Sequence, residues 1–235
     1  MKTTLSIADL RKTARLTGAL YFILAVLGIF SFMYAGPLLY VSGDATATAH
    51  KMLANESLLR MDIAIGAISN VMFIVIALLL YQMLGHINEF QAKLMVYLVL
   101  VSVPVAFSGH ALELTALEMF KGKLLPTFQL DQAHSLAMSF LKIARISGQL
   151  LTVYWGLWLI PLGLLVFRSG FIPKIFGVLL LINGLGYLVQ CFTFILLPGS
   201  LQPLMKFIFP IYFAGEIPFI FWLLIKGVRD HSTML

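Results

Sequence analysis

The feature that most constrains this chain is a series of six stretches, each long and apolar enough to cross a lipid bilayer. A membrane-spanning helix needs about 20 mainly apolar residues, because the hydrocarbon layer is about 30 Å thick and a helix rises about 1.5 Å per residue. The sequence therefore predicts an all-α, polytopic membrane protein. We expect one domain, residues 1–235, that forms a bundle of six transmembrane helices with short amphipathic interfacial helices. The predicted spans are 16–35, 58–84, 92–120, 143–167, 175–197 and 203–225.

The composition also favours lipid over water as the solvent of the fold. Hydrophobic residues make up 60% of the chain and charged residues 11%, whereas soluble domains carry about 25% charged residues. The net charge is +6, but most basic residues flank the apolar stretches, where they set topology and meet anionic lipid headgroups. Because no basic face with interleaved aromatic residues is present, we expect membrane lipids as partners and no nucleic acid.

Local signals predict how the first span ends. Gly36 and Pro37 are expected to break the helix, and a polar connection follows at residues 38–57. Within this connection, Asp44 is well placed to cap a short helix from Ala45 to Leu53 that would lie at the membrane surface.

The fourth span is part of a longer helical pattern from Asp131 to Phe167. Such a helix would measure about 55 Å, so we expect it either to project from the membrane or to break, for example at Gly148. Polar residues three or four positions apart mark one face of its first part: Ser135, Ser139, Lys142, Arg145, Gln149 and Thr152.

The distribution of lysine and arginine predicts the orientation, because such residues favour the cytoplasmic side. With the N-terminus inside, nine lie on the inner side and seven on the outer side. The first apolar run exceeds the roughly 7–15 residues of a signal-peptide core, so we expect an uncleaved span. The sequence thus predicts a multi-pass protein of the inner (cytoplasmic) membrane with both termini in the cytoplasm. Four basic residues before the first span decide this orientation: Lys2, Arg11, Lys12 and Arg15.

Polar groups among the apolar residues are the candidate functional residues. An ionisable group at the bilayer centre costs at least about 2.5–3.5 kcal/mol unless it has a partner or a water-filled cavity. Glu216 lies ten residues before Lys226, about 15 Å along a helix, which places it near the centre. Asn183 and Asn70 are expected at similar depth, while other polar residues crowd the outer half.

These placements predict a polar cavity between helices, open to the outer face, with Glu216 at its floor. Arg145, with Lys142 in reserve, is the expected cationic partner of Glu113 or Glu216. The predicted ligand-binding residues are Glu216, Glu113, Arg145, His110, Gln149, Tyr154, Trp155, Asn183 and Gln190. A structural alternative is that these side chains only join helices through hydrogen bonds.

Catalytic and metal-binding patterns are missing from the sequence. It contains neither HExxH nor CxxC, and Cys191 is its only cysteine, so we expect no metal, cofactor or disulfide. His110 and Glu113 lie three residues apart on one helix face, which supplies at most half of a metal site. No serine stands in a nucleophile-elbow context.

Three segments resemble a known family. They read RKTARLTGALYFILAVLGIFSFMY at 11–34, GQLLTVYWGLWLIPLGLLVFRSGFIPKIFGVLLLINGLGYLV at 148–189 and GEIPFIFWLLIKGV at 215–228. Together they are similar to a family of uncharacterised bacterial integral membrane proteins, the domain-of-unknown-function 4386 family, over nearly the whole chain. The resemblance implies membrane location and six-helix architecture, and it assigns no activity or catalytic residue.

Three functions stay open from the sequence. The favoured one is binding or transport of a small or amphipathic molecule through the outward-facing cavity. The second is a non-catalytic accessory or structural subunit, in which Gly184 and Gly186 would mark helix contacts. The third is an intramembrane enzyme on lipid or isoprenoid substrates, with Glu216 or Glu113 as acid or base.

Overall fold

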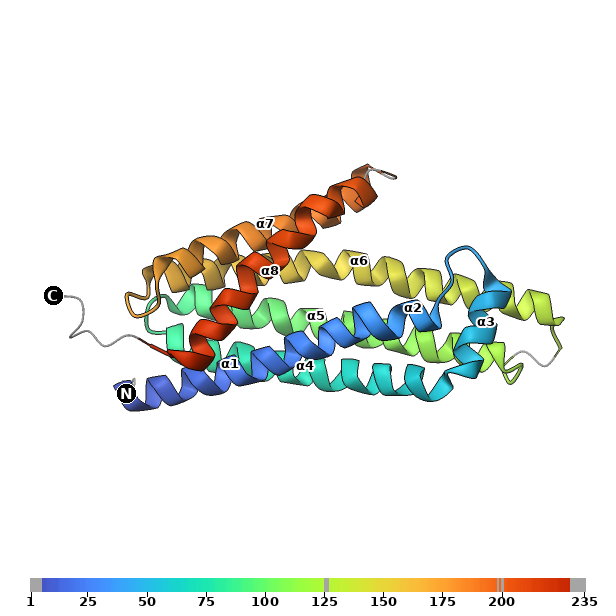
Figure 1. The fold of residues 1–235 in the computed structure, drawn as a ribbon, viewed down its shortest axis with the longest axis horizontal. Coiled ribbons are helices and arrows are strands. Elements are labelled where there is room, and N and C mark those ends of the chain that lie inside the picture. Colours follow the sequence, from blue (N-terminus) through green and yellow to red (C-terminus); the bar gives the residue numbers. More distant parts are fainter. Residues whose placement is uncertain (1–5, 125–126, 198, 200, 229–235) are drawn as a thin grey trace. The chain divides into compact units, whose positions relative to one another are not determined.

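The computed structural model describes residues 6–124, 127–197, 199 and 201–228 (Figure 1). Lys2 and Arg229, two of the basic residues behind the predicted orientation, lie outside these ranges. The elements are helical: α1 (Ile7–Ile29), a π-helical segment η1 (Phe30–Ala35), α2 (Gly36–Leu39), α3 (Ala45–Ala54), α4 (Glu56–Leu84), α5 (Glu89–Phe120), α6 (Leu130–Arg168), α7 (Lys174–Leu196) and α8 (Leu201–Ile225).

Among the residues that the structure describes, six helical segments are long and apolar enough to cross a membrane, which confirms the all-α, six-helix class. They are Ile7–Leu39, Glu56–Leu84, Glu89–Phe120, Leu130–Arg168, Lys174–Leu196 and Met205–Ile225. The bounds of α4, α5, α7 and α8 differ from the predicted spans by at most three residues. The other two helices begin much earlier than their spans, α1 at residue 7 rather than 16 and α6 at residue 130 rather than 143.

The break predicted at Gly36 and Pro37 is wrong, because the helical path continues through both residues to Leu39. Proline normally interrupts a helix, since it lacks an N–H and its ring collides with the carbonyl four residues earlier. Here the wide turn of η1 comes first, and the Gly36 N–H bonds the carbonyl of Ser31, five residues back. Pro37 then lies in the first turn of α2, where a missing N–H is tolerated.

The other two local predictions have different outcomes. The short helix predicted from Ala45 to Leu53 is confirmed as α3, and Asp44 caps it by accepting a hydrogen bond from the Ala47 N–H at 2.8 Å. Its place at the membrane surface stays a prediction. Gly148 does not break α6, which runs through 39 residues without interruption. At about 1.5 Å per residue this helix exceeds the hydrocarbon thickness, so part of it extends beyond the apolar layer.

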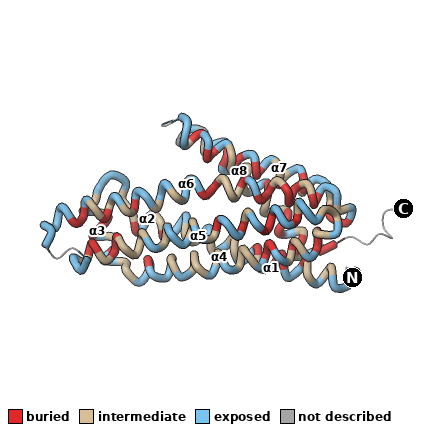
Figure 2. The backbone as a smooth tube through the Cα atoms, turned by 180° about the vertical axis from the view of Figure 1, so that it is seen from behind, coloured by how far each residue is buried: buried red, intermediate tan, exposed pale blue. Residues whose placement is uncertain are grey.

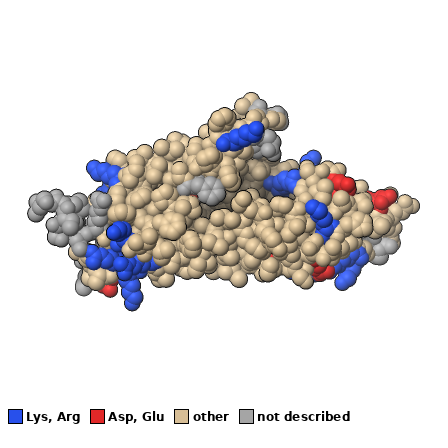
Figure 3. All heavy atoms as spheres, in the orientation of Figure 1, with Lys and Arg blue, Asp and Glu red and all other residues tan. Residues whose placement is uncertain are grey.

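Helix α7 shows how lipid rather than water shapes the exposed surface. Its polar residues Asn183, Gln190 and Thr193 are buried. Large apolar side chains are exposed at helical spacing along the same helix: Ile175, Val178, Ile182, Leu185, Val189, Phe192 and Leu196. Figure 2 shows buried and exposed residues interspersed along the helices, and acidic and basic side chains are sparse on the face seen in Figure 3. An apolar exterior around a polar interior fits a membrane-spanning helix.

The chain divides into two compact units, each with its own set of packed helical segments. Unit 1 comprises residues 1–24, 72–102 and 151–235, and unit 2 comprises residues 25–71 and 103–150. The division falls inside α1, α4, α5 and α6, whereas α7 and α8 belong to unit 1 and α2 and α3 to unit 2. Unit 2 has an apolar core that includes Leu39, Met52, Leu117 and Phe120.

In unit 1, paired glycines bring the backbones of α6 and α7 together. A Cβ atom on Gly177 would lie 2.7 Å from the Gly163 carbonyl oxygen, and one on Gly184 would lie 2.9 Å from that of Gly156. Both distances are shorter than real Cβ contacts. The two glycines of each helix are seven residues apart, so they fall on one face and form an antiparallel pair of contacts. Small residues of this kind allow close helix packing in lipid.

Candidate functional site

Glu216 on α8 is the centre of a polar cluster in unit 1. The Tyr21 hydroxyl on α1 donates a hydrogen bond to Glu216 Oε1. The Asn183 Nδ2 amide on α7 donates to Glu216 Oε2 at 2.8 Å. The Tyr187 hydroxyl on α7 also interacts with the carboxyl group. Among the described residues, the partners of this mid-span carboxyl are thus uncharged hydrogen-bond donors.

Two further residues extend the cluster along α7 and α8, which pack side by side. The Tyr187 and Tyr212 rings stack with centroids 4.0 Å apart at an interplanar angle of 14°. The Tyr212 hydroxyl donates a hydrogen bond to Gln190 Oε1. We call this set the Glu216 cluster, and it consists of Tyr21, Asn183, Tyr187, Gln190, Tyr212 and Glu216.

Helical spacing explains why these side chains meet. Asn183, Tyr187 and Gln190 are four and three residues apart, so they lie on one face of α7, and Tyr212 and Glu216 are four residues apart on α8. Gly215 lets α7 approach, since a Cβ there would lie 2.5 Å from the Asn183 Cβ. The sequence therefore builds the cluster from facing polar stripes joined through a glycine contact.

Gly18 brings α1 to the same place. A Cβ on Gly18 would lie 2.8 Å from the Leu224 Cα on α8, so the two backbones are in direct contact. Tyr21, one turn further along α1, is buried with 4% of its surface exposed. This approach positions its hydroxyl against Glu216.

Tryptophan side chains surround the tyrosines. The Trp158 ring packs on Tyr21 with centroids 6.1 Å apart, and the Phe73 ring meets Trp158 edge-on at 4.8 Å. Trp155 meets Tyr187 edge-on at 5.9 Å. Trp158 and Trp155 of α6 therefore pack against two tyrosines of the cluster, and Phe73 of α4 packs behind Trp158.

Asn183 has an acceptor atom that the described residues leave unused. Its side chain is fully buried, and its Oδ1 atom has no hydrogen-bond partner among them. A buried acceptor without a partner costs about 1–3 kcal/mol. Glu216, Tyr187 and Tyr212 are only partly buried, whereas Asn183 and Gln190 are buried.

Four predicted site residues lie in unit 2. His110 Nδ1 lies 3.2 Å from Glu113 Oε2, one turn further along α5. The His110 ring is pressed against Gly66 on α4, where it would overlap a Cβ atom. Arg145 places its guanidinium 3.8 Å from the centroid of the Tyr40 ring, a cation–π contact. Gln149 is partly buried on α6.

The predicted residues belong to both units, and the contacts within each unit are as follows. Glu216, Asn183, Gln190 and Trp155 belong to unit 1 and meet in or against the Glu216 cluster, and Tyr154 lies partly buried on α6 in the same unit. In the part of unit 2 that the structure describes, Glu113 pairs with His110, and no ion pair joins it to Arg145.

Tyr21, Tyr187 and Tyr212 are not among the residues predicted from the sequence. A usable signal existed for two of them, since Tyr187 follows Asn183 and Tyr212 precedes Glu216 by one helical turn of four residues. Tyr21 carries no such signal, because α1 and α8 are far apart in the chain.

A second polar group lies in unit 2. The Ser31 hydroxyl, within η1, donates to Asp62 Oδ1 on α4 at 2.5 Å. Across the described ranges, no group of three or more His, Cys, Asp or Glu side chains has the geometry to hold a metal ion.

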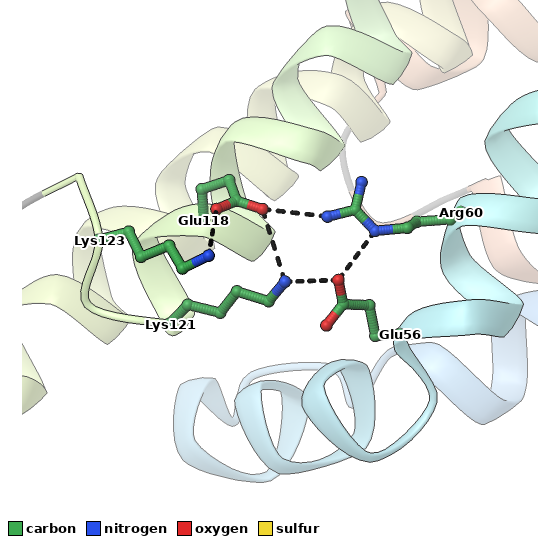
Figure 4. Close-up of polar contacts among 5 residues, drawn as sticks. All are labelled: Glu56, Arg60, Glu118, Lys121 and Lys123. Carbon is green, nitrogen blue, oxygen red and sulfur yellow. Dashed lines mark hydrogen bonds and ion pairs between the residues drawn. The ribbon is translucent and has the colours of Figure 1, made fainter.

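Five charged residues form an ion-pair network in unit 2 that ties the start of α4 to the end of α5 (Figure 4). Arg60 contacts Glu56 at 2.8 Å and Glu118 at 3.1 Å, and Lys121 pairs with both carboxylates. Lys123 reaches Glu118 at 4.0 Å. Each charge is used by a neighbour of opposite sign, so we assign this network to structure.

An apolar hollow of about 400 Å³ lies on α7 of unit 1. Its lining does not include Glu216, and it is an irregularity of the exposed apolar face. The lining residues are Leu185, Leu188, Val189, Phe192, Thr193, Leu196 and Leu197.

Comparisons with known proteins place the chain without giving an activity. An uncharacterized protein of Archaeoglobus fulgidus is 36% identical over 81 residues, which cover 32% of this chain and 43% of that protein. The chain thus spans less than half of the length of this relative. No solved structure matches. A family model described as "Domain of unknown function (DUF4386)" matches residues 16–227, nearly the whole chain, and the protein therefore belongs to this family of membrane proteins.

Proposed function

We propose that this protein binds a small or amphipathic molecule within the membrane, and that the Glu216 cluster is the binding site. The observation that carries the proposal is the environment of Glu216. Glu216 lies at mid-span and is only partly buried as a residue, and its carboxyl has uncharged donors as partners among the described residues. Such a group costs at least about 2.5–3.5 kcal/mol at this depth.

The character of the neighbours supports a binding role. The cluster combines a carboxyl, an unused amide oxygen, stacked tyrosines and flanking tryptophans. Sites for small molecules are typically lined by aromatic and apolar groups with a few polar atoms that fix the orientation of the ligand. The side chains of Tyr187, Tyr212 and Glu216, which are partly exposed, form the entrance in this proposal.

The proposed orientation places both termini in the cytoplasm and the protein in the cytoplasmic membrane. Basic residues near the start of α1 and after α8 support it, because positive charge is retained on that side. The end of α7 and the start of α8 would then face outwards. Tyr212 and Gln190 lie between Glu216 and these helix ends, so the polar residues would lead from the outer side to Glu216.

A structural role in a membrane assembly is the second candidate. The glycine contacts between α6 and α7 favour it, since such close packing serves helix association without any ligand. The two functions differ in whether the Glu216 cluster holds a molecule other than bulk lipid.

Native mass spectrometry of the protein purified in mild detergent distinguishes them. We expect the wild type to retain a molecule of defined mass, and Glu216→Gln to lose it. Glu113→Gln is the matched control, because it changes a carboxyl that pairs with His110 in unit 2, and it should retain the molecule. Absence of any retained mass, or equal retention by Glu216→Gln, would refute the binding role and favour the structural one.

A further inference from the structure

We propose that the ligand of the Glu216 cluster carries a primary ammonium head on an apolar body. This inference rests on the proposed function and specifies the chemical class of the ligand.

The first argument is the hydrogen-bonding character of the free atoms. The Asn183 Nδ2 amide is committed to Glu216 Oε2 at 2.8 Å, which fixes the amide so that Oδ1 is the atom left over. This Oδ1 is buried and lacks a partner among the described residues. It accepts hydrogen bonds and cannot donate them. A ligand head that satisfies it must therefore supply an N–H or O–H group.

The second argument is charge. The Glu216 carboxyl is bonded by Tyr21 and Asn183 and contacted by Tyr187, so the described residues give it donors without a counter-charge. Coulomb attraction is much stronger in a low-dielectric interior than in water. A cationic head would neutralise the carboxylate where a hydroxyl would only share a hydrogen bond with it.

The third argument is the aromatic wall. Tyr187 and Tyr212 stack at the partly exposed side of the cluster, and Trp155 meets Tyr187. Aromatic faces attract cations, and they repel anionic heads by the same electrostatics. An ammonium beside Glu216 Oε2 would also be next to Asn183, so its several N–H groups can bond both residues at once.

Three probes with the same alkyl chain separate these requirements. Octylammonium offers charge and N–H donors, octyltrimethylammonium offers charge alone, and octan-1-ol offers an O–H donor alone. Each is titrated into the full-length protein in phosphatidylcholine nanodiscs, with tryptophan fluorescence as the readout, since Trp155 and Trp158 adjoin the cluster. Each variant is titrated in the same way. A fluorescence change that all proteins share reports partitioning of the probe into lipid, and a difference between them reports binding at the cluster.

We expect saturable binding of octylammonium at least about tenfold tighter than that of either other probe. Glu216→Gln should abolish the preference for octylammonium over octanol. Asn183→Ala should weaken the binding of octylammonium and leave the binding of octyltrimethylammonium unchanged, because only octylammonium donates a hydrogen bond to Oδ1. Asn70→Ala is the matched control, since Asn70 bonds the Gly66 carbonyl in unit 2, and it should bind like the wild type.

The outcomes distinguish the ammonium class of the ligand from the proposed binding function on which it rests. Equal binding of octanol and octylammonium, unaltered by Glu216→Gln, would refute the cationic head and leave a binding site. Absence of saturable binding, although a molecule is retained in native mass spectrometry, would also refute the ammonium class alone. If neither saturable probe binding nor a retained molecule is seen, both proposals fail. Thermal melting checks that each variant is folded, and if Asn183→Ala is not, the probe selectivities of wild type and Glu216→Gln decide.

Discussion

Replacing Gly177 by alanine tests the backbone contact between α6 and α7. A Cβ at this position would lie 2.7 Å from the Gly163 carbonyl oxygen, 2.7 Å from the Phe167 backbone nitrogen and 2.8 Å from the Phe167 Cβ. Ordinary contact begins at 3.4 Å, so the helices must separate by roughly half an ångström or more. None of the three atoms belongs to the flexible end of a side chain, and the backbone itself must move.

The expected free-energy change is the difference of two effects. Overpacking of a close contact costs about 1–3 kcal/mol. Alanine recovers up to about 1 kcal/mol, because glycine is the poorer helix former. With the full gain of about 1 kcal/mol subtracted, we expect Gly177→Ala to lower the free energy of unfolding by up to about 2 kcal/mol.

Gly186→Ala is the matched control on the same helix. Its Cβ would lie 3.5 Å from the Tyr212 Cε1, which is ordinary contact, so only the helix-propensity gain applies. We expect this variant to be as stable as the wild type or slightly more stable.

Reversible unfolding in mixed detergent micelles, followed by circular dichroism, measures both variants under identical conditions. If Gly177→Ala and Gly186→Ala prove equally stable, α6 and α7 are not in backbone contact at Gly177, and the explanation of their close packing by paired glycines is refuted.

Three further predictions concern single polar contacts. Tyr21→Phe removes the hydroxyl that donates to Glu216, so we expect a loss of about 1–3 kcal/mol in the same unfolding assay, and an unchanged stability would contradict the contact. Asp44→Ala removes the α3 cap and should cost about 1 kcal/mol, which faster amide hydrogen exchange confined to α3 would report. Glu118→Gln removes a carboxylate from the ion-pair network, so it should lower stability at low salt and have little effect at high salt, because partly exposed ion pairs are screened.

The membrane-spanning class could be predicted because it depends on local composition. Each apolar stretch must be long enough for the bilayer, and its length can be read directly from the sequence. The Asp44 cap is equally local, since a side chain bonds a backbone group three residues later. Features that depend on a few adjacent residues were therefore within reach of sequence analysis.

The helical path through Pro37 could not be predicted from the sequence, because η1 changes the hydrogen-bond pattern before the proline. Nothing in the sequence Phe30–Ala35 marks a π turn, which arises when a helix accommodates one extra residue against its neighbours. The failure at Gly148 is similar, since the packing of a long helix outweighs the low propensity of a single glycine.

Only some members of the Glu216 cluster could be predicted from the sequence. Depth along a helix identified Glu216 and Asn183, because distance from a flanking lysine is a one-dimensional quantity. The choice of partner is three-dimensional. It depends on which helices approach α8, and the glycine contacts at Gly18 and Gly215 determine that. Arg145 was predicted to pair with a carboxylate because of its charge alone. Within unit 2 its guanidinium contacts the ring of Tyr40.

The π turn at Phe30–Ala35 has a consequence for comparing members of this family. One additional residue in a helix rotates everything after it by about 100°. A relative that lacks the insertion would present a different side chain at the place where Ser31 meets Asp62. Correct alignment of such a relative therefore requires a one-residue gap in the middle of a transmembrane helix, where alignment procedures penalise gaps most heavily.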